Sequence, residues 1–79
     1  MSETADKFLD LQGLLCPIPV VKLAKAAKEI EVGQTIEAVA TDPGVLADIP
    51  AWCKTTGNEL LNIGKGEGNT IVFLVKKMK

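Results

Sequence analysis

The order in which strand-like and helix-like hydrophobic patterns follow one another is the feature that most constrains this fold. Four segments have the alternation or the β-branched content of strands: residues 7–12, 35–41, 58–64 and 70–76. Two segments have apolar residues at helical spacing: residues 20–30 and 45–56. The order is therefore β-α-β-α-β-β. Right-handed crossovers place both helices on one face of a four-stranded mixed sheet, so we expect an α/β fold built as an α+β two-layer sandwich.

Pro50 interrupts the second helical pattern. Proline has no N–H group for the helix ladder, and its ring clashes with the preceding turn. We therefore expect the regular part of this helix to begin near Ile49, capped by Asp48, after one irregular turn. Gly57 follows at a position where glycine commonly ends a helix.

The sheet has an uncovered face in this arrangement. The last strand is apolar on both faces over Ile71–Val75, which predicts a central strand or one that is half covered by a partner. Apolar residues also fall on the register opposite to the core: Phe8, Val39, Val72 and Leu74. They are interpreted either as scattered surface residues, which all proteins have, or as a face on which a partner docks.

Length and composition limit the chain to one domain. We expect a single domain over residues 1–79, with residues 1–7 as a flexible tail, because 79 residues build one modest core. Hydrophobic residues make up 47% of the chain and aromatic residues 4%, so the core must be aliphatic. The formal net charge of −1 gives no general attraction to phosphate backbones, and we expect no direct binding of nucleic acid.

The sequence predicts neither export nor membrane insertion. It contains no apolar run of the roughly 18 residues that span a membrane, and Met1–Lys7 lacks the apolar centre of a signal peptide. We expect a cytoplasmic protein without direct membrane contact. In that reducing compartment its two cysteines stay free thiols.

The chain contains no histidine. Cys-His nucleophilic pairs, Ser-His-Asp triads and histidine-containing zinc sites are therefore excluded within one chain. Two cysteines alone do not complete a structural zinc site. We expect no metal and no cofactor, so the chemistry of the chain depends on a thiol.

Cys16 opens a Cys-Pro-Ile-Pro turn just before the first helical pattern. If Cys16 is the N-cap, Pro17 and Pro19 fall at positions whose N–H groups have no helical partner. A residue before proline avoids the α region, so the helix alternatively begins at Pro19. In both cases Cys16 lies within one turn of a helix N-terminus, whose dipole stabilises an exposed anion by about 0.3–1 kcal/mol. We expect a reachable, modestly activated thiol; the alternative is a small buried hydrophobe beside its leucine neighbours.

Cys53 shares a helical face with Ile49 and Trp52, which predicts a position in the core. The alternative is a redox partner for Cys16. A thioredoxin-type Cys-x-x-Cys is excluded, because neither residue three positions from Cys16 is a cysteine.

One stretch resembles the signature of the TusA/SirA-like sulfur carrier family: Leu9-Asp10-x-x-Gly13-Leu14-x-Cys16-Pro17-x-Pro19. Four later segments match the pattern of that family as well: residues 33–35, 41–43, 48–50 and 56–59. The resemblance runs from about Leu9 to Lys77, nearly the whole chain. Leu15 departs from it, because many relatives carry a charged residue, often Arg, at that position.

The resemblance implies the same β-α-β-α-β-β sandwich and a function. It implies that Cys16 accepts a sulfane sulfur as a persulfide and transfers it to a partner protein. The implied donors are a cysteine desulfurase or a rhodanese, and the implied acceptors include DsrE-like proteins. The implied pathways are tRNA thiolation, molybdenum cofactor synthesis and dissimilatory sulfur oxidation. Such a protein is a sulfurtransferase-type relay component more than a self-standing enzyme.

The residues around Cys16 predict how a partner reaches it. The turn that supports the thiol consists of four residues: Gly13, Leu14, Pro17 and Pro19. The expected docking residues are Leu15, Ile18 and Lys22. Because a short chain builds no deep cleft, we expect transient protein docking in place of a substrate pocket. Two other functions remain open: a dithiol redox protein using Cys16 and Cys53, and a non-catalytic regulatory or interaction module.

Overall fold

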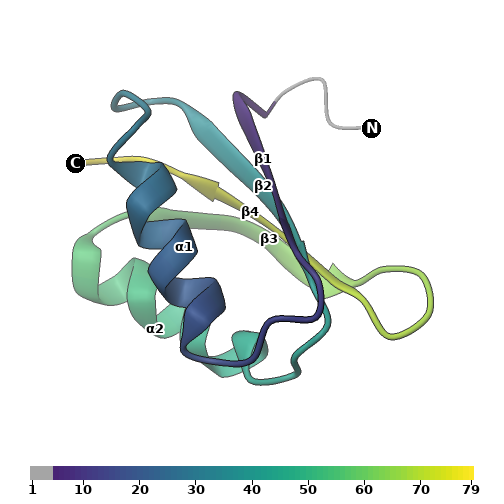
Figure 1. Cartoon of the computed structure of the whole chain (residues 1–79). Helices are drawn as coiled ribbons and strands as arrows, with labels where there is room; N and C mark the ends of the chain where they lie inside the picture. Colours follow the sequence, from purple (N-terminus) through teal and green to yellow (C-terminus); the bar gives the residue numbers. More distant parts are fainter. Residues whose placement is uncertain (1–4) are drawn as a thin grey trace.

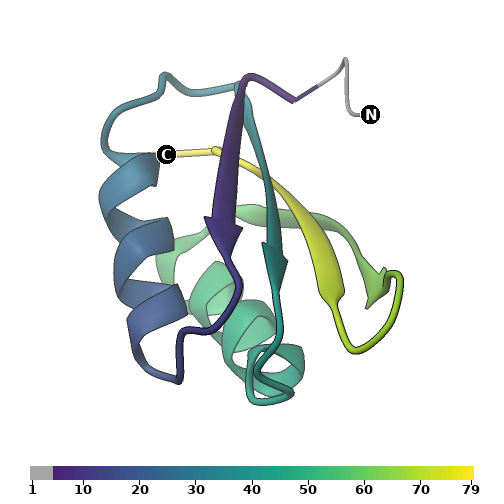
Figure 2. The ribbon, with the colours of Figure 1, turned by 45° about the vertical axis from the view of Figure 1, so that its right-hand side comes forward.

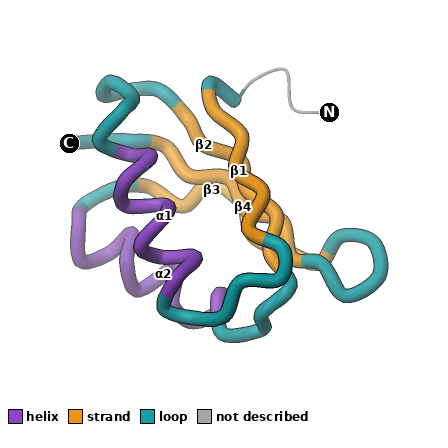
Figure 3. Tube along the Cα trace, viewed as in Figure 1, coloured by secondary structure: helices purple, strands orange, loops and turns teal. Residues whose placement is uncertain are grey.

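The computed structural model describes residues 5–79, and its helices and strands follow the predicted order. The strands are β1 (Lys7–Leu11), β2 (Thr35–Ala40), β3 (Glu59–Lys65) and β4 (Ile71–Lys76). The helices are α1 (Ile18–Ala27) and α2 (Val45–Thr56). Both helices lie on the same face of the sheet (Figure 1, Figure 3), which confirms the predicted α+β two-layer sandwich. Neither helix is long and apolar enough to cross a membrane.

The sheet is mixed and has the strand order β1-β2-β4-β3. β1 is parallel to β2, whereas β4 is antiparallel to both of its neighbours. Figure 2 shows β4 between β2 and β3, which confirms the prediction of a central last strand. Ile71, Phe73 and Val75 are buried on the face that the helices cover, and Val72 and Leu74 are half-buried on the other face.

The core lies between the sheet and the two helices. Ile36, Ala38 and Ala40 of β2 alternate inward, as their spacing predicts, and each is at most 1% exposed. Leu23 of α1 and Phe73 of β4 are fully buried against them. Each large apolar side chain buried in this way stabilises the fold by roughly 1.5–3 kcal/mol. A core of mostly aliphatic residues therefore joins the sheet to the two helices.

α2 begins earlier than the sequence predicts. The helix runs from Val45 with Pro50 in its interior, so the predicted start near Ile49 with an Asp48 cap is wrong. Gly44 occupies the N-cap position. Val45 and Ile49 are both fully buried and lie one turn apart on the same face. Their burial offsets the single helix hydrogen bond that Pro50 cannot donate.

The face of the sheet opposite the helices carries the apolar residues that the alternation places there. Phe8 of β1 is 60% exposed, and the other members of this set are half-buried. Phe8 pairs with Glu37 of β2, which in turn pairs with Leu74 of β4. Charged and apolar side chains therefore alternate across this face.

The predicted N-terminal tail comprises residues 1–7, of which residues 1–4 lie outside the described residues. The Asp6 N–H donates to the Thr35 carbonyl oxygen over 3.0 Å. The Asp6 carboxylate accepts a hydrogen bond of 2.8 Å from the Thr35 N–H. These contacts lead the chain into β1, which begins at Lys7.

Candidate functional site

Cys16 lies in the loop that joins β1 to α1, and hydrogen bonds fix the path of this loop. The Leu14 N–H donates to the Leu11 carbonyl oxygen over 3.3 Å. The Gly13 N–H donates to Thr41 Oγ1, at the end of β2, over 2.9 Å. Gly13 has a φ of +80°, a left-handed conformation that favours glycine. Gly13 therefore sets the direction in which the chain leaves β1 towards Cys16.

α1 begins at Ile18, shortly after Cys16. Pro17 occupies the N-cap position and Pro19 the second helical position, so the helix starts between the two positions considered from the sequence. The expectation that Cys16 lies within one turn of the helix N-terminus is confirmed. Pro19 is buried and belongs to the packed interior, whereas Pro17 is exposed. The Cys16–Pro17 peptide bond is cis.

The loop between β2 and α2 holds Cys16 from the other side. Asp42 Oδ2 accepts a hydrogen bond of 2.7 Å from the Cys16 N–H. Asp42 Oδ1 accepts a second hydrogen bond, of 3.2 Å, from the Gly44 N–H. A Cβ atom at Gly44 would lie 3.0 Å from Cys16 Sγ, closer than side-chain atoms normally pack. Asp42 and the bare backbone of Gly44 therefore form a close cradle for the half-buried Cys16.

Carboxylates dominate the electrostatics of this thiol. A hydrogen bond to Asp48, partial burial and the neighbouring Asp42 together raise the pKa of the Cys16 thiol to about 12. The prediction of a modestly activated thiol is therefore wrong. The positive end of α1 supplies no N–H from Pro17 or Pro19, and its dipole is outweighed by the two carboxylates. The N–H groups of Cys16 and Gly44 lower the pKa of Asp42 by hydrogen bonding to its charged form.

The residues expected to contact a partner are on the surface around Cys16. Leu15 is 72% exposed and Ile18 is 43% exposed. Lys22 is exposed one turn further along α1. Val21, which the sequence did not single out, adds an apolar side chain that is 57% exposed to the same end of the helix.

A shallow groove of about 360 Å³ runs between α1 and α2 next to this surface. Pro17 and Val20 line it from the α1 side, and Asp48 and Trp52 line it from the α2 side. Trp52 was expected to face the core, and it is half-buried, packing against the core while it borders the groove. Its exposed part gives the groove an aromatic wall within reach of the Cys16 turn.

Cys53 lies in a different environment. It is 3% exposed, which confirms the prediction that it belongs to the core. Burial raises the pKa of its thiol. Both cysteines are free thiols.

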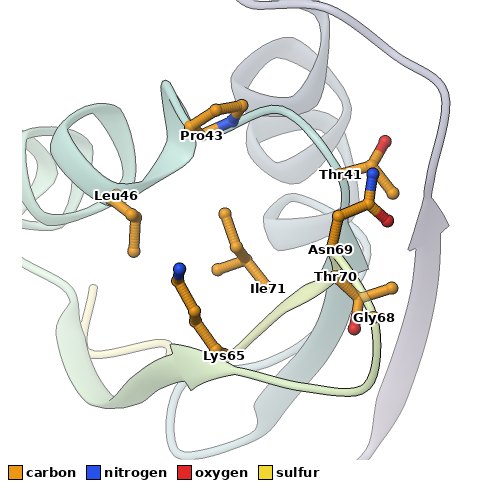
Figure 4. A pocket seen from close by; sticks show the side chains of 8 residues that line it. All are labelled: Thr41, Pro43, Leu46, Lys65, Gly68, Asn69, Thr70 and Ile71. Carbon is orange, nitrogen blue, oxygen red and sulfur yellow. The ribbon is translucent and has the colours of Figure 1, made fainter.

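A second cavity, of about 320 Å³, is bordered by the loop between β2 and α2 and by the turn between β3 and β4 (Figure 4). Thr41 and Pro43 border it from that loop, and Leu46 borders it from α2. Lys65 of β3 and Asn69 of the following turn complete it with polar groups. Its loop residues flank Asp42, whose carboxylate faces Cys16 instead.

A family model described as sulfurtransferase TusA matches residues 7–77. The chain belongs to the TusA family. It is 43% identical over 72 residues to the sulfur carrier protein TusA of Allochromatium vinosum, and this match covers 91% of this chain and 93% of that protein. A protein of Aquifex aeolicus is 44% identical over 71 residues, which are 90% of this chain and 36% of that protein. The chain therefore spans about a third of the length of the Aquifex relative.

One solved structure has the same fold as this chain. The crystal structure of a SirA-like protein from Desulfitobacterium hafniense superposes with a TM-score of 0.81 at 19% sequence identity. The superposition covers 92% of this chain and 99% of that one. At this sequence identity the similarity shows only that the two chains share a fold.

Sequence reasoning linked neither of two acidic residues of the site to the chemistry of Cys16. Asp42 and Asp48 belong to segments that match the TusA family pattern, and this was the available signal. Asp42 lies 26 positions from Cys16 in the chain, and only the fold brings the two together. Asp48 was interpreted as a helix cap, whereas it lies inside the first turn of α2 and interacts with the Cys16 thiol.

Proposed function

We propose that this chain is a sulfur carrier, which accepts a sulfane sulfur on Cys16 as a persulfide and passes it to an acceptor protein. The observation that carries the proposal is the position of the half-buried Cys16 in the turn before α1. Membership of the TusA family supports it, since that family includes proteins named as sulfur carriers. Gly13, Leu14 and the two prolines around Ile18 are proposed to hold the turn in place.

The transfer is a pair of thiol exchange steps. In loading, the Cys16 sulfur loses its proton and attacks the outer sulfur of a persulfide on the donor. The donor S–S bond breaks, the new S–S bond forms on Cys16, and the donor cysteine leaves as a thiolate that takes up a proton. Unloading repeats these events with an acceptor thiolate as the attacking group and Cys16 as the leaving group. The two steps balance without an external oxidant or reductant.

The partners are proposed to be proteins. A cysteine desulfurase or a rhodanese is the proposed donor, and sulfur-accepting proteins of the DsrE-like type are proposed acceptors. They would dock on Leu15, Ile18 and Lys22, because an attacking sulfur must approach Cys16 closely. The proposed setting is the cytoplasm, in a relay for tRNA thiolation, molybdenum cofactor synthesis or dissimilatory sulfur oxidation.

Intact mass after incubation with a cysteine desulfurase and cysteine, or with a rhodanese and thiosulfate, tests this proposal. A carrier gains the mass of one or more sulfur atoms, and the gain disappears on treatment with a reductant. The dithiol alternative needs Cys53 to reach Cys16, and the burial of Cys53 disfavours it. A loss of two hydrogen atoms would support that alternative, and an unchanged mass with every donor would contradict the carrier function.

A further inference from the structure

Two carboxylates that form no ion pair within residues 5–79 lie beside the Cys16 turn. Asp42, in the loop between β2 and α2, accepts a hydrogen bond from the Cys16 N–H, and Asp48, in the first turn of α2, lines the same groove as Pro17, the residue after Cys16. All nine basic residues of the chain are lysines. Within residues 5–79 the one ion pair joins Lys7 to Glu29, so neither Asp42 nor Asp48 is neutralised by a lysine of the described chain.

The other elements around Cys16 contribute no charge to its thiol. Residues 12–15, which lead into the turn, are uncharged, and so is the first turn of α1 up to Val21. The charged side chains that shift the titration of this thiol are Asp48 and Asp42 alone among the residues described. The residues next to Cys16 on the β1–α1 side are therefore uncharged, and the first cation along α1 is the exposed Lys22.

Both halves of the proposed transfer place negative charge on the same atom. Cys16 Sγ attacks as a thiolate in loading and departs as a thiolate in unloading. Two carboxylates beside Sγ oppose this charge in both steps. They also repel anionic thiols such as glutathione, which carry negative charge to the site. A partner whose docking surface brings a lysine or an arginine to Asp42 and Asp48 removes both obstacles.

We propose that Asp42 and Asp48 are specificity-determining residues, which slow sulfur exchange between Cys16 and small anionic thiols and favour partner proteins that bring a cationic side chain to the site. This inference rests on the proposed carrier function and deepens it. It assigns to donor and acceptor proteins one shared feature, a basic residue beside the cysteine that exchanges sulfur. The carrier retains its sulfur while it is free in solution, and it exchanges the sulfur when it is bound to such a partner.

Asp48→Asn is the variant that tests the assignment. It removes one charge and keeps the size of the side chain, and no backbone group depends on this carboxylate among the hydrogen bonds of residues 5–79, whereas Asp42 also holds two N–H groups. Glu31→Gln is the matched control, because it removes one charge from an exposed residue beyond the opposite end of α1. Thermal melting of both variants verifies that they are folded.

The first measurement follows sulfur release from loaded Cys16 to three small thiols of different charge at low salt. The thiols are cysteamine, 2-mercaptoethanol and 3-mercaptopropionate, compared at equal thiolate concentration. In the native chain we expect cysteamine to react about tenfold faster than 3-mercaptopropionate, with the neutral thiol between them. In Asp48→Asn this spread falls to about threefold or less, and in Glu31→Gln it stays as in the native chain.

The second measurement is alkylation of unloaded Cys16 by iodoacetamide, located by peptide mass. When the pKa of a thiol falls by one unit, its thiolate fraction rises tenfold while its nucleophilicity falls about threefold. We expect Asp48→Asn to be alkylated at least about threefold faster than the native chain and Glu31→Gln at the native rate.

The outcomes separate the inference from the proposed function. Equal rates with the three thiols, or a spread that Asp48→Asn leaves unchanged, overturn the specificity role and leave the carrier intact. If Cys16 is never loaded, the carrier function fails, and alkylation still decides whether Asp48 restrains the thiol. An alkylation rate that is the same in all three proteins overturns the assignment.

Discussion

The two cysteines of this chain show how two environments separate one side-chain chemistry into two roles. The pKa of both thiols is raised, but carboxylates are the main cause at Cys16 and burial is the cause at Cys53. Cys16 lies half-buried in a loop that a partner can reach, whereas Cys53 is 3% exposed in the core. The direction of the pKa shift therefore does not distinguish the proposed carrier thiol of Cys16 from the core thiol of Cys53. The two thiols differ in their accessibility to a partner, and only Cys16 has neighbouring carboxylates that we propose a docking partner neutralises.

Replacing each cysteine in turn should give the largest difference between the two thiols, which is a difference in sulfur loading. We expect Cys16→Ser to lose all sulfur loading and to stay folded, because the hydroxyl is close to the thiol in size and Cys16 is only half-buried. Cys53→Ser should keep loading. Intact mass after incubation with a donor reads the loading of both variants. Loading that survives in Cys16→Ser would move the carrier site away from this turn.

The pH dependence of alkylation gives the next largest effect. Since the pKa of Cys16 is raised to about 12, the neutral thiol is favoured and the rate should rise about tenfold per pH unit from pH 7 to 10 without a plateau. An unperturbed thiol of pKa about 8.5 would level off within this range. Iodoacetamide labelling of folded Cys16, followed by peptide mass, measures the profile. A plateau near pH 9 would mean that the carboxylates leave the thiol unperturbed.

The fold was more predictable from the sequence than the site. The alternation in β2 and the helical spacing around Leu23 are local patterns, and they were enough for the element order and the two layers. The start of α2 was not predictable from local patterns, because the burial of Val45 and Ile49 in the tertiary structure outweighs the local penalty of Pro50.

The electrostatics of the site were beyond the reach of local patterns. The position of Cys16 before a helix was predictable from its two prolines, and the structure bears this out. The charge around its sulfur was not, because Asp42 comes from a loop 26 positions away and Asp48 from the following helix. Only the packing of α2 beside α1 brings these carboxylates to the thiol.

Stability provides a smaller contrast between the two cysteines. Cys53→Ser places a hydroxyl in an apolar core, and an unsatisfied buried polar group costs about 1–3 kcal/mol. We expect the free energy of unfolding to fall by about that amount, against a smaller change for Cys16→Ser, since Cys16 is only half-buried. Urea denaturation followed by the fluorescence of Trp52, the single tryptophan, measures both. Equal losses in the two variants would contradict the assignment of Cys53 to the core.

The smallest effect concerns docking. Leu15→Asp with Lys22→Glu should slow transfer from a cognate donor protein severalfold, because both side chains are exposed beside Cys16. Alkylation of Cys16 by iodoacetamide, which is uncharged, should be much less affected. Val32→Asp with Lys28→Glu is the matched control, since it makes the same charge changes at exposed residues near the far end of α1. Transfer reactions are stopped at intervals and their products are identified by intact mass, which gives the rates. Equal slowing by the two double variants would place the docking surface elsewhere.

Peptide-resolved mass spectrometry of the native chain after donor loading tests the central claim most directly. The protein is loaded while folded, its free thiols are blocked, and the added sulfur is located on the peptide that contains Cys16 or the one that contains Cys53. The account predicts sulfur on Cys16 and none on the buried Cys53. Sulfur distributed equally between the two cysteines, or found on Cys53 alone, would contradict it.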